Sequence, residues 1–153
     1  AFMAIDPDNA LIYEGNAEQY LAELSDLDRA YKDGLASCAI RDIVASHGAF
    51  GYLAKRYNLN VVHIAGLSPE EEPSPKRIAE IAEFAREKKI KYIFFETLVS
   101  PKLAETIAAE IGAKTSVFNP MEGLTKEELA EGKNYISVMK ENLSALRQAL
   151  SCI

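Results

Sequence analysis

Residues 39–52 read AIRDIVASHGAFGY, and this stretch decides the fold. The apolar run from Ala39 to Ala45 predicts a strand, and the residues from about Ala49 to Tyr57 predict a short helix after it. A strand followed closely by a helix is typical of a parallel α/β sheet. His47 then lies at the carboxyl end of the strand, at the edge where open α/β folds bind their ligands.

The alternation of apolar runs and amphipathic stretches continues to the end of the sequence. Further strands are expected at 61–65, 92–95 and 115–118. Helices are expected from Ser74-Pro75, from Ser100-Pro101 to Gly112, and from about Asn134 to Leu150. Four strands separated by helices predict an α/β fold with a four-stranded parallel sheet flanked by helices and right-handed crossovers.

A long helix is expected before the sheet. Apolar side chains recur there at spacings of four and three, at Tyr13, Ala17, Tyr20, Leu24, Leu27 and Tyr31. Asp6-Pro7 is a strong helix start, and Gly34 is expected to be the left-handed cap at the other end. At 1.5 Å per residue this helix measures roughly 40 Å, which a protein with a single lobe has little use for.

The composition limits the classes of protein to consider. The 153 residues are 48% hydrophobic, enough for one domain with a core of its own. A net charge of -6 argues against nucleic acid as a partner, because nucleic-acid binding needs clustered Lys and Arg. No run of 18 apolar residues and no charged-then-apolar leader occurs, so an exported protein is expected to be a processed or truncated piece here.

The two cysteines, Cys38 and Cys152, allow two interpretations. They are either two reduced, unrelated thiols or a disulfide that ties the C-terminal helix to the sheet. A disulfide that closes so long a loop would stabilise the fold by about 4–5 kcal/mol in the chain-entropy model, and it requires an oxidising compartment. No CxxC pair is present, which argues against a redox motif.

Three polar side chains are candidates for a site at the carboxyl edge of the sheet. His47 follows the first strand, Glu96 ends the strand at 92–95, and Glu122 lies in the loop after the fourth strand. Imidazole suits zinc and similar transition metals, so His47 is a candidate metal ligand. A loop glutamate such as Glu122 is by itself nearly always solvated, although the stiff turn at Asn119-Pro120 could hold its carboxylate in place. Glu96 is expected to orient His47 or to play a structural part. His63, inside the second strand, is expected to be a packed or edge residue.

Other chemistry is weakly supported by the sequence. It contains no Walker A motif, no GxGxxG loop and no GxSxG elbow, so no enzyme nucleophile and base are identified. The acidic, proline-rich stretch 67–75 is expected to be a solvated loop, because nothing fixes the geometry of its carboxylates.

In five ordered segments the sequence resembles the zinc-specific (ZnuA/AdcA-like) solute-binding proteins of bacterial metal ABC importers. The resemblance covers essentially the whole chain. Its segments are Asp6–Tyr20, Ser46–Leu53, Gly66–Pro75, Ile93–Glu96 and Tyr135–Leu143. Each segment alone is modest evidence, whereas five in the right order are highly specific.

The resemblance implies two α/β lobes joined by a rigid helix, with metal bound between them. Residues 1–34 would be the interlobe helix and residues 35–153 the C-terminal lobe, with the N-terminal lobe absent. Of four family ligands, two histidines would belong to that absent lobe, and the other two map onto His47 and Glu122. We therefore expect weak, exchangeable Zn²⁺ binding by this chain alone.

The expected function is capture of zinc outside the cytoplasm, in the periplasm or at a lipid anchor on the membrane's outer face, and its delivery to an ABC permease. No enzymatic activity is expected. Two alternatives remain open at this stage. One is a manganese or iron receptor of the same family, and the other is a free-standing flavodoxin-like α/β enzyme domain.

Overall fold

Four short strands form a sheet in which every neighbouring pair runs parallel, in a computed structural model that describes residues 1–66 and 73–153. The strands are β1 (Asp42–Ala45), β2 (Asn60–His63), β3 (Tyr92–Phe95) and β4 (Lys114–Val117). Their order is β2-β1-β3-β4, so β1 and β3 lie in the centre. The predicted four-stranded parallel sheet is confirmed.

Among the four strands, β3 alone has the bounds predicted from the sequence. The later start of β1 has a clear cause. Residues 39 and 40, expected in the first strand, pair with the C-terminal tail: the Ala39 and Ile40 amides donate to the Ser151 and Leu150 carbonyls. The bounds of β2 and β4 also differ from the predicted ones, although hydrogen bonding continues past both. The Ile64 amide, for example, still donates to the Ala45 carbonyl over 2.9 Å.

Helices cover both faces of the sheet. The alternation of side chains along β1 sends Ile43 and Ala45 to one face and Val44 to the other. Val44 lies in the core under α4 (Pro75–Glu87) and α5 (Lys102–Ile111). Ile43 and Ala45 lie in the core under α3 (Gly51–Tyr57), which follows the 3₁₀ turn η2 (Gly48–Phe50), and α7 (Tyr135–Ala149).

The expected helix ends around the sheet are mostly confirmed. Ser74 caps α4 by accepting the Arg77 amide, and Asn134 caps α7 by accepting the Ser137 amide. Gly112 ends α5 in the left-handed conformation, with φ of 69°. A short helix α6 (Lys126–Ala130) was not predicted, although Thr125 and Glu128 form a capping box that could have revealed it.

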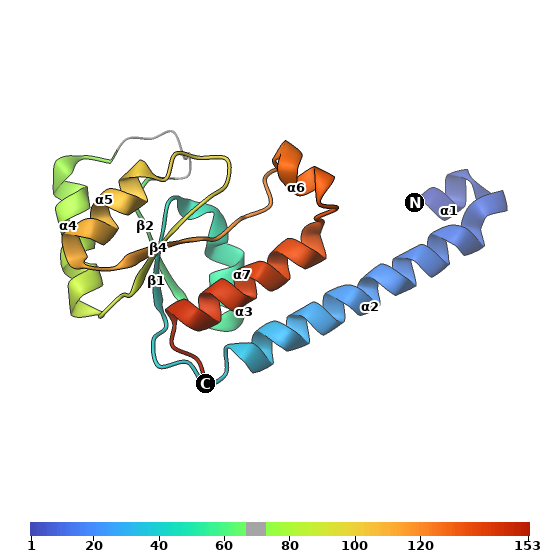
Figure 1. The fold of residues 1–153 in the computed structure, drawn as a ribbon. Coiled ribbons are helices and arrows are strands. Elements are labelled where there is room, and N and C mark those ends of the chain that lie inside the picture. The colour runs from blue at the N-terminus through green and yellow to red at the C-terminus, as the bar shows by residue number, and fades with distance from the viewer. Residues whose placement is uncertain (67–72) are drawn as a thin grey trace.

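The long helix is α2 (Ala10–Gly34), and it begins later than predicted. A short helix α1 (Phe2–Ile5) and a 3₁₀ turn η1 (Pro7–Asn9) precede it. Asp6 does not cap the main chain, because its carboxylate accepts hydrogen bonds from the Asn9 and Tyr13 side chains instead. The apolar stripe is buried only at Leu27 and Tyr31 in this chain, and the N-terminal part of α2 projects away from the sheet (Figure 1).

The prediction of Gly34 as a left-handed cap is wrong. Gly34 is the last residue of α2, and the cap position belongs to Leu35. Glycine leaves room for close packing there: a Cβ atom at this position would approach the Leu143 and Arg147 side chains to 3.3 Å. Gly34 therefore permits the close packing of α2 against α7, which the Tyr31 hydroxyl strengthens by donating to the Met139 carbonyl over 2.7 Å.

A polar cluster joins α2 to α3. The Asp28 carboxylate accepts hydrogen bonds from Arg56 at 2.6 Å and from the Tyr57 hydroxyl at 2.9 Å. The Arg56 guanidinium and Lys32 hold the pKa of Asp28 well below its usual range. Burial, and then the bond to Asp28, raise the pKa of Tyr57 to about 12. These contacts fix the C-terminal half of α2 to the lobe.

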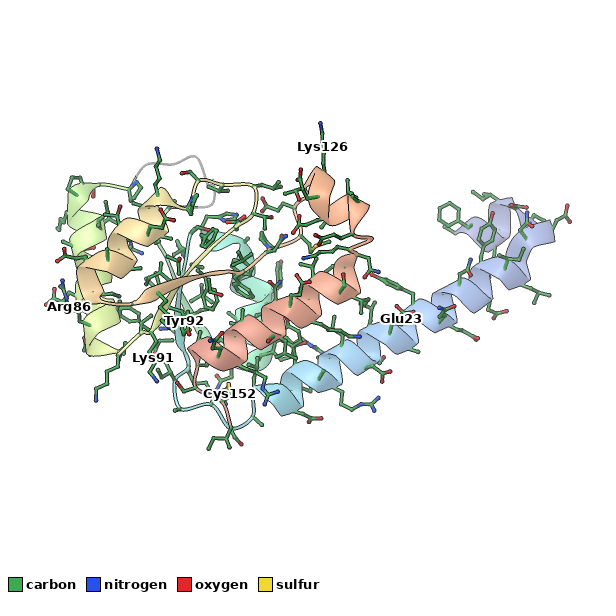
Figure 2. The ribbon with its side chains drawn as sticks, viewed as in Figure 1. Glu23, Arg86, Lys91, Tyr92, Lys126 and Cys152 are labelled. Carbon is green, nitrogen blue, oxygen red and sulfur yellow. A yellow bond between two sulfur atoms is a disulfide. The ribbon has the colours of Figure 1, made fainter. Side chains whose placement is uncertain are left out.

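Cys38 and Cys152 form a disulfide, as one of the two interpretations predicted. Figure 2 shows Cys152 near the end of α2, where the C-terminal tail returns to the body of the molecule. No helix among the described residues is both long enough and apolar enough to span a membrane. The expectation for the acidic stretch concerns mainly residues 67–72, which lie outside the described residues.

Candidate metal centre

His47 lies where the sequence predicted, just past the carboxyl end of the central strand β1. Its backbone is still extended, and η2 begins at the next residue. The imidazole is only 1% exposed. A ring so deeply buried needs partners for both nitrogens, because an unpaired buried polar atom is costly.

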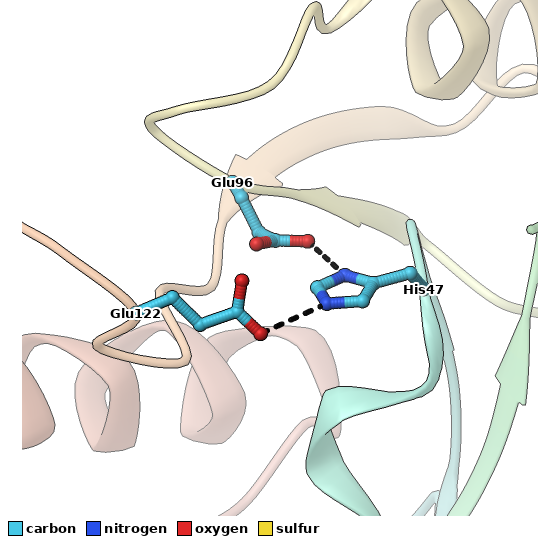
Figure 3. Close-up of side chains that lie close together, drawn as sticks. All are labelled: His47, Glu96 and Glu122. Atoms are coloured by element: carbon cyan, nitrogen blue, oxygen red, sulfur yellow. Dashed lines mark hydrogen bonds and ion pairs between the residues drawn. The ribbon is translucent and has the colours of Figure 1, made fainter. Parts of the chain in front are cut away.

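Glu96 supplies the first partner. It follows β3, is 4% exposed, and its Oε1 atom contacts Nδ1 of His47 (Figure 3). The same carboxylate oxygen accepts a 2.6 Å hydrogen bond from the Ser46 hydroxyl. Among the residues that the structure describes, Nδ1 makes no hydrogen bond, so the Glu96 carboxylate is its close polar contact. A buried carboxylate of this kind fixes the orientation of the ring and favours a proton on Nδ1.

Glu122 approaches the other nitrogen from a loop beyond β4. Its Oε1 atom lies 3.3 Å from Nε2 of His47, and its side chain is 54% exposed. All three predicted side chains thus come together, with one ligand atom of each within 4.8 Å of the others (Figure 3). Two carboxylates beside one imidazole give a site that suits a divalent cation.

The loop that carries Glu122 is held by two buried asparagines. Asn142 on α7 donates from Nδ2 to the Asn119 carbonyl over 2.7 Å and accepts from the Asn119 amide over 2.9 Å. The Asn119 side chain in turn accepts from the Met121 amide over 2.8 Å. The sequence indicated a stiff turn at Asn119-Pro120. Asn142 lies in the resembling segment Tyr135–Leu143, but the sequence indicated no role for it.

His63 takes no part in this cluster. It is the last residue of β2, an edge strand, and it is exposed. Its carbonyl accepts a hydrogen bond from Arg77. The expectation that His63 is a packed or edge residue fits its position at the sheet edge.

Comparison with known proteins points to one family. The family model of ZnuA, described as zinc-uptake complex component A, periplasmic, matches residues 1–149. The high-affinity zinc uptake system protein ZnuA of Bacillus subtilis is 48% identical over 145 residues, which are 95% of this chain and 46% of that protein. The zinc-binding lipoprotein AdcA of Streptococcus pneumoniae is 48% identical over 142 residues, which are 93% of this chain and 28% of that protein.

Solved structures give the same result. The Zn(II)-bound ZnuA-like domain of Streptococcus pneumoniae AdcA superimposes with a TM-score of 0.82 at 46% identity, over 97% of this chain and 56% of that one. The laminin-binding protein Lbp of Streptococcus pyogenes gives a TM-score of 0.87 at 36% identity, over 97% and 57% of the two chains. The present chain therefore spans about half the length of these structures, and less than half of the two curated relatives.

Proposed function

The chain belongs to the family of the periplasmic zinc-uptake component ZnuA, and on that premise we propose that it is a zinc-capturing lobe of a solute-binding protein. Zinc is the cargo in this proposal, and no covalent chemistry is involved. His47 and Glu122 would bind the ion directly.

The distance between these two side chains is the observation that carries the proposal. The 3.3 Å between Nε2 of His47 and Oε1 of Glu122 is long for a hydrogen bond, since such bonds centre near 2.9–3.0 Å. Two ligands of a tetrahedral zinc ion at about 2.0–2.1 Å from the metal lie about 3.3 Å apart. A zinc ion could thus replace the direct contact with little movement of either side chain.

Glu96 has a supporting role in this proposal. Its carboxylate would hold a proton on Nδ1 of His47, which leaves the Nε2 lone pair directed toward Glu122 and the metal. The bond from Ser46 would in turn keep the carboxylate of Glu96 in place. Because both His47 and Glu96 are buried, the ligand is oriented before the metal arrives.

Two protein ligands leave a tetrahedral ion incomplete. We propose that residues 1–34 form an interlobe helix, that residues 35–153 form the C-terminal lobe, and that a second lobe of the same protein supplies further histidines. The projecting half of α2 supports this division (Figure 1). The disulfide, the periplasmic family description and the lipoprotein relative support a place outside the cytoplasm, and the zinc-uptake relative supports delivery to an ABC permease.

A calorimetric titration with zinc tests the proposal. The chain of residues 1–153 should bind zinc weakly and exchangeably, whereas the complete natural protein should bind it tightly. Sub-micromolar affinity of the monomeric 1–153 chain would contradict the proposed division of ligands between lobes. Competition with manganese in the complete protein tests the metal, and a preference for manganese would contradict a zinc carrier.

A further inference from the structure

We propose that Asn142 and Asn119 form a clamp that positions Glu122 for the metal. This inference rests on the proposed function, because it assigns a purpose to the way in which the Glu122 loop is held. Asn142 would act as a positioning residue that does not touch the ion itself.

The first step is the two-point contact between Asn142 and the main chain of residue 119. The last ladder-type hydrogen bond after β4 is made by Phe118, whose amide donates to the Phe95 carbonyl over 2.8 Å. The sheet offers no such partner to the amide and carbonyl of Asn119. The Asn142 side chain pairs with both, so it continues the pattern of a neighbouring strand by one residue.

The second step is the turn that follows. The Asn119 side chain accepts the Met121 amide, a short Asx turn that leads the chain around Pro120. Met121 has a φ of 64°, a left-handed conformation that a side chain other than glycine rarely adopts. This conformation needs support from another residue, and the Asn119 side chain supplies it by accepting the Met121 amide. Met121 directly precedes Glu122.

The clamp also contacts the structure on both of its own sides. Nδ2 of the Asn119 side chain donates to the Thr97 hydroxyl over 3.2 Å, and Thr97 directly follows Glu96. On its other side, Asn142 lies one helical turn beyond Met139, whose carbonyl accepts the Tyr31 hydroxyl of α2. The clamp therefore lies between the long helix and the Glu122 loop, at 3% and 4% exposure of its two asparagines.

Zinc binding by the complete protein tests this inference through a double-mutant cycle. Asn142→Ala should weaken zinc binding about tenfold, mostly by faster dissociation, because it frees the loop and leaves the ligand itself intact. In the background of Glu122→Gln the same change should alter the affinity less than about twofold, since the clamp would have no ligand left to position. Gln148→Ala, an exposed change on the same helix, is the matched control.

Amide exchange of the metal-free protein gives an independent readout. The Met121 amide should exchange faster in Asn142→Ala, while the amides of β1 and β3 keep their protection. If Asn142→Ala does not fold, Asn119→Ala replaces it, because that variant keeps both main-chain bonds to Asn142 and loses the side-chain bonds to the Met121 amide and the Thr97 hydroxyl. It should also speed exchange at Met121 and weaken zinc binding.

The outcomes separate this inference from the proposed function. Loss of affinity in Glu122→Gln with no change in Asn142→Ala would overturn the clamp and leave the function standing. An equal effect of Asn142→Ala in both backgrounds would also overturn it, since that result marks a general loss of stability. No effect of Glu122→Gln on zinc binding would contradict the proposed function itself.

Discussion

His47 and Glu122 face each other across 3.3 Å, yet one side chain is 1% exposed and the other 54%. His47 extends a central strand and is held by a buried carboxylate, whereas Glu122 stands on a loop beyond an outer strand. The sheet itself holds the His47 side chain in place. Two asparagines hold the loop of Glu122, so a metal site formed by these two side chains would have a rigid side and a side that can be adjusted.

We expect this difference to give the two proposed metal ligands different tasks. A buried ligand whose partner is also buried loses little freedom when metal binds, which favours affinity. An exposed ligand on a loop can move away without disturbing the core, which favours release. Zinc binding by variants of the complete natural protein tests this assignment.

Removal of the rigid donor should have the largest effect. His47→Ala is expected to weaken zinc binding by more than about 100-fold, because loss of a direct ligand exceeds the 10–100-fold typical for the groups that support one. Competition with a chelator of known affinity measures the change. A loss below tenfold would remove His47 from the set of ligands.

Removal of the charge on the adjustable donor should follow. Glu122→Gln keeps the size of the side chain and is expected to weaken binding by about 10–100-fold, mainly through faster dissociation. Stopped-flow release into a chelator measures this rate. If the association rate fell and the dissociation rate did not change, the two sides of the site would not differ in the way proposed.

A smaller effect is expected at Glu96, which contacts the proposed ligand His47. Glu96→Gln should weaken zinc binding by about tenfold, because an amide still accepts from Nδ1 but stabilises its proton less. Glu110→Gln is a matched control, since it removes one negative charge from an exposed glutamate on α5 that pairs with Arg86. Equal losses in the two variants would mean that net charge, rather than orientation of His47, sets the affinity.

The smallest effect is expected at Ser46. Ser46→Ala removes the 2.6 Å hydrogen bond to Glu96 and should weaken zinc binding by about two- to fivefold, because the carboxylate keeps its contact with His47. Calorimetry on both proteins measures the ratio. A loss as large as that in Glu96→Gln would mean that Ser46 contributes as much to zinc affinity as the Glu96 carboxylate does.

Features that depend on neighbours in sequence were predicted well. Tyr92–Phe95 is apolar throughout and forms a strand with the expected bounds. The caps at Ser74, Asn134 and Gly112 are local signals, and the structure contains all three. The meeting of His47 and Glu96 follows from topology, because parallel strands end at one edge of the sheet, and Glu122 joins them from the loop beyond β4.

Features that depend on distant partners were missed. The start of β1 is later than predicted because the C-terminal tail takes the pairing positions of residues 39 and 40. Gly34 is a site of close helix packing, and its partners lie more than 100 residues away. Asn142 interrupts the apolar face of α7, but only the position of Asn119 gives that interruption a meaning.

The disulfide between Cys38 and Cys152 sets an order of events during the making of this protein. Its two cysteines are separated by 114 positions, so during synthesis from the N-terminus the first thiol waits for every residue between them. The strands, His47, Glu96 and Glu122 all belong to that interval. The bridge can therefore close only after all four strands have been synthesised, and a molecule with a free Cys38 lacks the covalent link between the start of the sheet region and the C-terminal tail.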